Sequence, residues 1–272
     1  MINYRKTKWL PLTGAVLLAA VGLSPVVAAG EIGNSVQVKS VTSEPAGNFL
    51  RVKVELRNTS TQLITGYALA ATVVFANGQM AHGEITADTA WVLVNERMGY
   101  PPASDEVFGP GQVTTPTIDV RIEASADYQP GASPSPKLSA AVMMVAFADK
   151  TALGSEQAIA ALMGLRRNEA DEATDLVADL DSFRGAPDIP AAVRELISNV
   201  QSKGAAANLR GNDRQLAARR LSALQRYAVP IEEHPELLPL VTKSWQIRSE
   251  VLREHSSLLR IGTGVEKLEE KR

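Results

Sequence analysis

LSAAVMMVAFADKTALGSEQAIAALMGLRR, residues 138–167, joins two kinds of secondary structure in one continuous segment. Its first half, through Phe147, is a compact apolar run rich in Val and Met, which predicts a buried strand. Its second half, from Ser155, has apolar residues at helical spacing, which predicts one face of a helix. Upstream sequence favours strands, and nearly all downstream sequence favours helices. We therefore expect the architecture to change between Asp149 and Gly154.

Composition limits the functions open to this chain of 272 residues. A hydrophobic content of 45% is ordinary for a globular protein, and the length allows one large domain or two modest ones. The formal net charge of −2 predicts no general attraction to nucleic acid. The absence of cysteine excludes disulfides, thiolate catalysis and cysteine-ligated zinc.

Residues 1–29 have the pattern of a signal peptide. A positively charged head is followed by an uncharged apolar stretch from Leu12 to Leu23, and Val27-Ala28-Ala29 supplies small residues for a signal peptidase. The alternative is an uncleaved membrane anchor, but the apolar stretch is shorter than the ~20 residues that a span needs. We expect a mature chain that begins at Gly30, has no stable membrane span, and resides in the periplasm or exterior of a bacterium.

Residues 30–150 carry the patterns of an antiparallel β-protein. The clearest strand alternates apolar and charged residues, and its apolar positions are Leu50, Val52, Val54 and Leu56. Six or seven short strands separated by Gly, Pro and Asn turns predict a β-sandwich domain. The layout resembles immunoglobulin-like or fibronectin-like modules in architecture only, and such a resemblance implies no function.

Two turns in this region carry further predictions. Asn77-Gly78 follows an expected strand over Leu63 to Phe75 and predicts a two-residue type I′ hairpin, which needs positive φ at both positions. Asn58-Thr59-Ser60 closes the earlier strand with turn chemistry. The same tripeptide is an N-glycosylation sequon, which is the less favoured interpretation for a bacterial protein.

Residues 151–272 predict an α-helical domain with a charged C-terminal tail. The helices are expected over Ser155 to Phe183, Ile189 to about Gly204, Asn212 or Asp213 to Tyr227, and about Leu240 to Gly262. Four amphipathic helices with short links predict a helical bundle. The apolar stripe around Trp245 and Leu252 has an alternative interpretation as an oligomer interface.

Charge is unevenly distributed over the expected helices. The first is acidic and carries Glu169, Asp171, Glu172, Asp175, Asp179 and Asp181. The third and fourth are basic and carry Arg214, Arg219, Arg220, Arg226, Arg248, Arg253 and Arg260. We expect neighbouring helices to complement one another, with each exposed pair contributing under ~1 kcal/mol. The alternative is a basic surface for an anionic partner.

The segment from Asn95 to Gln112, NERMGYPPASDEVFGPGQ, is the longest connection expected between strands. Long loops on a rigid scaffold often bind partners, and aromatic residues beside polar ones suit a protein or glycan surface. Arg97, Tyr100 and Phe108 are therefore the candidate binding residues. The alternative is a packed crossover in which Tyr100 and Phe108 anchor the loop.

The sequence supports no catalytic, metal or cofactor site. His82, His234 and His255 share no metal-binding motif, and no Gly-x-Ser-x-Gly segment is present. We expect a non-catalytic, exported cell-envelope protein that binds or scaffolds a protein or glycan partner. The alternative is an envelope hydrolase or carbohydrate-active enzyme in which Asp105 and Glu106 meet a further carboxylate through the fold.

Overall fold

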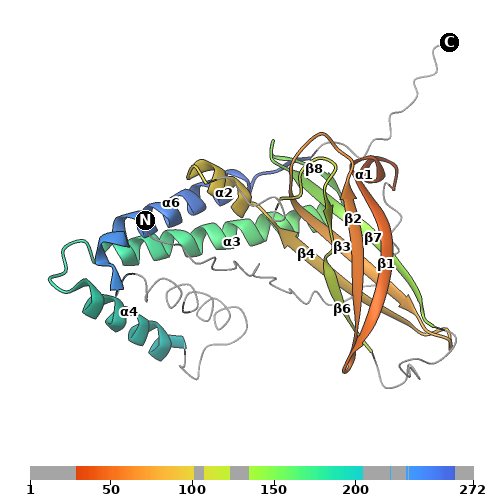
Figure 1. The fold of residues 1–272 in the computed structure, drawn as a ribbon, viewed down its shortest axis with the longest axis horizontal. Helices are drawn as coiled ribbons and strands as arrows, with labels where there is room; N and C mark the ends of the chain where they lie inside the picture. Colours follow the sequence, from red (N-terminus) through yellow and green to blue (C-terminus); the bar gives the residue numbers. More distant parts are fainter. Residues whose placement is uncertain are drawn as a thin grey trace, which may run out of the picture. The chain divides into compact units, whose positions relative to one another are not determined.

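The computed structural model describes residues 29–100, 107–122, 135–204, 221, 231 and 233–260 (Figure 1). This part of the chain is mixed α+β, as predicted, with two sheets and five α-helices. The strands are β1 (Val36–Ala46), β2 (Phe49–Asn58), β3 (Ile64–Val74), β4 (Met80–Asp88), β5 (Val113–Thr114), β6 (Thr117–Arg121), β7 (Lys137–Phe147), β8 (Thr151–Gly154) and β9 (Leu259–Arg260). The helices are α1 (Ala29–Ser35), α2 (Trp91–Arg97), α3 (Glu156–Asp181), α4 (Ile189–Gly204) and α6 (Leu238–Glu254), with a 3-10 helix η2 (Pro235–Leu237).

The described residues form two compact units. The first unit contains those within Met1–Thr89, Val107–Ile159 and Leu259–Arg272, and the second contains those within Ala90–Glu106 and Ala160–Leu258. These boundaries differ from the expected division at residue 150. Strand β8 extends a sheet past that residue, α2 belongs to the helical unit, and β9 returns to the sheets. The expected signal-peptide residues before 29 and the tail after 260 lie outside the described residues.

The first sheet is antiparallel, with β2 paired to β1 on one side and to β5 and β6 on the other. The inward-facing residues of β2 are fully buried, as the alternation predicts: Leu50, Val52, Val54 and Leu56. The opposite face of this sheet carries charged pairs between strands. Lys53 Nζ lies 2.7 Å from Glu44 Oε2, and Arg51 Nε lies 3.1 Å from Asp119 Oδ1. These side chains are about half exposed, so water screens their attraction.

The second sheet has the strand order β4-β3-β7-β8-β9 and is antiparallel except for the pairing of β8 with β9. The pairing register between β3 and β7 shifts between Ile64 and Gly66. This irregularity places both Ile64 and Tyr67 in the core. A regular alternation over the expected strand from Leu63 to Phe75 predicts that Leu63 faces the core together with Tyr67. This prediction is wrong, because the bulge interrupts the period of two and Leu63 is only half-buried.

Both sheets contribute side chains to one hydrophobic core. Residues from β1, β2 and β6 join residues from β3 and β7 in this cluster. Tyr67 and Phe108 meet edge to face, with ring centroids 5.8 Å apart and an interplanar angle of 73°. Such aromatic pairs stabilise a core beyond the area that they bury.

Burial raises the pKa of Tyr67 to about 12, while a side-chain hydrogen bond with Thr114 acts in the opposite direction. The unfolded chain releases this proton at a pH of about 10, so between these values only the folded chain retains it. We therefore expect the free energy of unfolding to fall by about 3 kcal/mol across this window and then level off. Denaturant unfolding at a series of pH values measures how the free energy of unfolding changes with pH. The same change in the Tyr67→Phe variant would contradict its assignment to Tyr67.

Asn58 ends β2 and is fully buried, with 0% of its surface exposed. Its Nδ2 donates to the carbonyl oxygens of Gln62 and Phe108, both at 2.8 Å. Its Oδ1 accepts from the backbone N–H and the hydroxyl of Ser60, at 2.9 and 2.7 Å. A glycan would have to be attached to Nδ2, so the folded chain does not present this sequon. The expected turn chemistry is confirmed.

A hairpin between β3 and β4 is confirmed, but its turn differs from the predicted type I′. Gly78 has a left-handed φ of 84°, whereas Lys150 is the non-glycine residue with positive φ among those described, so Asn77 has none. Gly78 N–H donates to the Phe75 carbonyl at 3.0 Å, and Phe75 N–H donates to the Gln79 carbonyl at 2.9 Å. These bonds define a three-residue loop that ends in a left-handed glycine.

Helices α3, α4 and α6 confirm three of the four expected helices. Buried apolar residues of these helices, together with Phe183 and Ile231 from outside them, form the core of the second unit: Leu176, Leu180, Phe183, Val193, Val200, Ile231 and Leu238. Leu221 packs against this core, and the rest of the third expected helix, from Asn212 to Tyr227, lies outside the described residues. Trp245 also packs against the core, and Leu252 is buried against Ala90 and Ala170. The stripe proposed as an oligomer interface is therefore used inside the unit.

Helix α6 ends at Glu254, earlier than the Gly262 expected from its apolar spacing. His255 has the non-helical angles φ −93° and ψ 6° and caps the helix. Four residues later, Leu259 pairs with Thr151 in the parallel ladder between β8 and β9. Pairing with a distant strand therefore replaces the last predicted helical turn.

Candidate functional site

The three predicted binding residues divide between the two units. Arg97 is the last residue of α2, and Tyr100 follows that helix in the second unit with 52% of its surface exposed. Phe108 lies in the core of the first unit and is only 3% exposed. Phe108 therefore fits the alternative in which this side chain anchors the loop. Binding by Arg97 and Tyr100 stays a prediction.

Helix α2 was not predicted from the sequence, and the segment from Asn95 to Gln112 was expected to be a loop. Only seven residues form this helix, too few to establish an apolar period. Val92 and Val94 are buried, and α2 lies beside α6 in the second unit (Figure 1). Asp105 and Glu106, the carboxylates of the alternative enzyme hypothesis, lie outside the described residues.

Arg97 joins the end of α2 to the end of α6 through a bidentate ion pair. Its Nη1 and Nη2 donate to Glu254 Oε1 and Oε2 at 3.0 and 2.9 Å, and Nη1 lies 4.0 Å from Glu250 Oε2. The hydrogen bond to Glu254 raises the pKa of Arg97, because it favours the charged guanidinium. With 40% of the Arg97 side chain exposed, this pair positions the residue more than it stabilises the unit.

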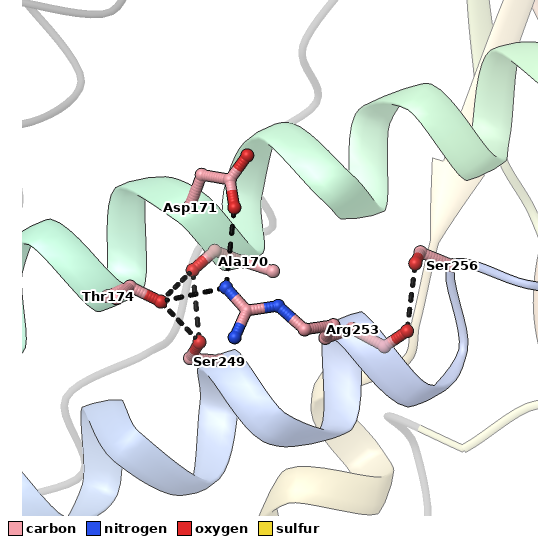
Figure 2. Close-up of polar contacts among 6 residues, drawn as sticks. All are labelled: Ala170, Asp171, Thr174, Ser249, Arg253 and Ser256. Carbon is pink, nitrogen blue, oxygen red and sulfur yellow. Dashed lines mark hydrogen bonds and ion pairs between the residues drawn. The ribbon is translucent and has the colours of Figure 1, made fainter.

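Helices α3 and α6 meet along a polar seam, which we define by Ala170, Thr174 and Ser249 (Figure 2). The hydroxyls of Thr174 and Ser249 lie 2.7 Å apart. Each hydroxyl also lies within hydrogen-bond distance of the Ala170 carbonyl, at 2.9 Å for Thr174 and 3.1 Å for Ser249. These short side chains keep both hydroxyls and the Ala170 carbonyl hydrogen-bonded where the two helices meet.

Charged side chains of α3 and α6 also pair near the seam. Arg253 Nη2 reaches from α6 to Thr174 Oγ1 at 3.2 Å and to Asp171 Oδ1 at 3.4 Å (Figure 2). Arg248 Nη2 bonds Glu169 Oε2 at 2.9 Å, with both side chains less than a third exposed. The expected complementarity between the acidic first helix and the basic fourth helix is confirmed at these two pairs. The basic residues of the third expected helix, Arg214, Arg219, Arg220 and Arg226, lie outside the described residues.

The three histidines lie outside the seam that Ala170, Thr174 and Ser249 define. His82 Nδ1 lies 3.0 Å from Thr72 Oγ1 on the second sheet, and His234 Nδ1 lies 3.1 Å from Glu236 Oε1 before α6. His255 is buried at the end of α6. Over the described residues, no group of three His, Asp or Glu side chains is placed to hold a metal ion.

The seam and its flanking pairs are contacts that hold helices together within one unit.

No protein-family model, curated protein or solved structure matches this chain. Its function is therefore argued from its own residues. Among the helices that the structure describes, none combines the length and apolar character needed to cross a membrane.

Arg166 on α3 is fully buried, and its Nη1 donates to the carbonyl oxygen of His255 at 3.0 Å. Carbonyls at the end of a helix lack partners within that helix, so this guanidinium caps α6 from a neighbouring helix. The sequence could not show this role, because the two residues are 89 positions apart.

Replacing Arg166 with Met should destabilise the second unit by about 1–3 kcal/mol, because a buried carbonyl loses its donor. Arg167→Met is the control, since Arg167 is exposed and lies next in the helix. Denaturant unfolding followed by tryptophan fluorescence measures both changes, since Trp91 and Trp245 both belong to the second unit. Equal stability of the two variants would contradict the capping role.

Proposed function

We propose that this chain is a non-catalytic, exported bacterial cell-envelope protein that binds or scaffolds a protein or glycan partner. The signal-peptide pattern of residues 1–29 supports export. We further propose that the sheets form an immunoglobulin-like or fibronectin-like sandwich and that the helices form a bundle. The core shared by both sheets and the separate helical core support this arrangement. Chain recovered from an envelope fraction should have the mass of residues 30–272, and retention of residues 1–29 would contradict cleavage.

The observation that carries the binding proposal is an exposed aromatic side chain close in sequence to an ordered charged pair. We define the α2 surface by Tyr100, Arg97, Glu250 and Glu254. Tyrosine and arginine are enriched among the residues that dominate binding energy at protein interfaces. Because Glu254 already holds the Arg97 guanidinium in place, binding loses little entropy in ordering this side chain.

This surface narrows the binding prediction made from the sequence. Tyr100 supplies an aromatic face for stacking on a sugar ring or an apolar side chain. Arg97 keeps exposed area for hydrogen bonds at the edge of that contact. Phe108 is left out, since its ring is already packed against Tyr67.

Tyr100→Ala should weaken partner binding at least about tenfold, because truncation of an interface hot spot costs about 2 kcal/mol or more. Mature protein immobilised on beads captures partners from an envelope lysate, and titration against the captured partner gives the affinity. Unfolding stability should stay within about 0.5 kcal/mol of the wild type, because Tyr100 is exposed.

Leu240→Ala is the matched control, since Leu240 is a large apolar residue of the same unit with 43% of its surface exposed. Its capture should equal that of the wild type. Equal capture by wild type, Tyr100→Ala and Leu240→Ala would contradict a binding role for the α2 surface. Whether the captured molecule is a protein or a glycan then identifies the partner class.

A further inference from the structure

Asn77 is the only asparagine in the sequence that is followed by glycine. Both residues are exposed in the hairpin loop between β3 and β4. No heavy atom lies within 4 Å of the position that a Cβ on Gly78 would occupy. Glycine therefore leaves the space beside the Gly78 backbone nitrogen free of a side chain, while its N–H is engaged by the Phe75 carbonyl.

We propose that Asn77 is a site of spontaneous deamidation through a cyclic succinimide. The Gly78 nitrogen bonds to Asn77 Cγ and loses its proton, while the Cγ–Nδ2 bond breaks and releases ammonia. Water then adds at one of the two ring carbonyls and opens the ring, which leaves aspartate or isoaspartate. The two steps consume one water and release one ammonia, with no oxidant or reductant.

The loop both orients the side chain and restrains the reaction. Asn77 Oδ1 accepts from Gln79 N–H at 3.0 Å, which draws electron density from Cγ and favours attack on it. Asn77 Nδ2 donates to Gln79 Oε1 at 3.1 Å, so the leaving group is also held. The opposing contact is the 3.0 Å hydrogen bond from Gly78 N–H to the Phe75 carbonyl, which must open before the nitrogen can attack.

Opening one backbone hydrogen bond at an exposed hairpin tip costs little compared with global unfolding. A single such bond should slow deamidation by about tenfold or less relative to the unfolded chain. Asn58 provides the contrast, because it is buried, its amide makes four hydrogen bonds, and Thr59 follows it. We expect modification at Asn77 and none at Asn58 in the folded protein.

The product changes the hairpin in two ways. Either product adds one negative charge to the loop. Isoaspartate also adds a carbon to the backbone between β3 and β4, which disturbs the turn that fixes their register. The fraction of chains with a modified β3–β4 hairpin should therefore increase with the age of the folded protein.

The test is incubation of native and denatured chain in mildly alkaline buffer, with assays of ammonia release and peptide mass mapping of isoaspartate. Asn77→Ser is the control, because its hydroxyl can still accept from Gln79 N–H but has no amide to lose. We expect native wild type to form isoaspartate at position 77 at a rate within about tenfold of the denatured chain. The native Asn77→Ser variant should release correspondingly less ammonia.

Two results would overturn the proposal. One is reaction at position 77 in denatured chain with no product there in native chain, which would show that the hairpin protects Asn77. The other is ammonia release from native Asn77→Ser equal to that from native wild type, which would place the reaction at another residue.

Discussion

Replacing Asn58 with Asp is expected to destabilise the first unit by at least about 3 kcal/mol. The change preserves size but exchanges the donor Nδ2 for an oxygen that faces the carbonyls of Gln62 and Phe108, both at 2.8 Å. Two buried acceptors lose their donor, and the new carboxylate is buried beside them. Denaturant unfolding followed by far-ultraviolet circular dichroism measures the loss.

Asn48→Asp is the matched control, because it makes the same chemical change at an exposed position in the turn between β1 and β2. This variant should stay within about 0.5 kcal/mol of the wild type. The loss in Asn58→Asp should also shrink as the pH falls. Burial raises the pKa of such a carboxyl group, and the protonated form can donate one of the two missing hydrogen bonds. Equal stability of the two variants would contradict the role assigned to Asn58.

Gly154→Ala is expected to cost at least about 3 kcal/mol, a second large effect in the first unit. Gly154 has φ 120°, a conformation that residues with side chains rarely adopt. A Cβ there would overlap the carbonyl oxygen of Met143 and lie 2.7 Å from Met144 Cα. Both contacts are with the backbone of β7, which cannot move aside without breaking its pairing with β8.

Gly164→Ala is the control for this substitution. Gly164 lies within α3, and no heavy atom is within 4 Å of the position that a Cβ would occupy there. Alanine favours a helix over glycine by up to about 1 kcal/mol, so this variant should be as stable as the wild type or more stable. Thermal unfolding of the two variants tests the pair. A Gly154→Ala protein that unfolds at the wild-type temperature would show that β7 and β8 do not approach as closely as the structure describes.

Local periodicity was sufficient to predict the strand from Phe49 to Asn58 and the helices α3, α4 and α6. Apolar residues alternate at Leu50, Val52, Val54 and Leu56, and all four are buried. Periodicity failed where the chain departs from regular spacing. The bulge near Gly66 moved Ile64 into the core, and the hairpin at Gly78 adopted a three-residue loop.

The candidate site was predicted only in part. The sequence shows which aromatic residues lie in a long connection. Tyr100 is one of them, and the structure shows that it is exposed. The burial of Phe108 agrees with the alternative of a packed crossover, but its partners were not predictable, because its carbonyl and ring contact Asn58, Ile64 and Tyr67 from earlier strands. The helix α2 was also missed, since its formation depends on packing beside α6.

By itself, the sequence determined the class of structure and its broad division, with most of the strands before the long helices and complementary charge on the first and last of the expected helices. These properties follow from local spacing and composition, which neighbouring residues set. Only the tertiary structure decided which residues act together. Arg97 pairs with Glu254 across 157 positions, and Arg166 caps His255 across 89. Such contacts depend on how the whole chain packs, because no local pattern encodes the partner of a side chain so distant in sequence.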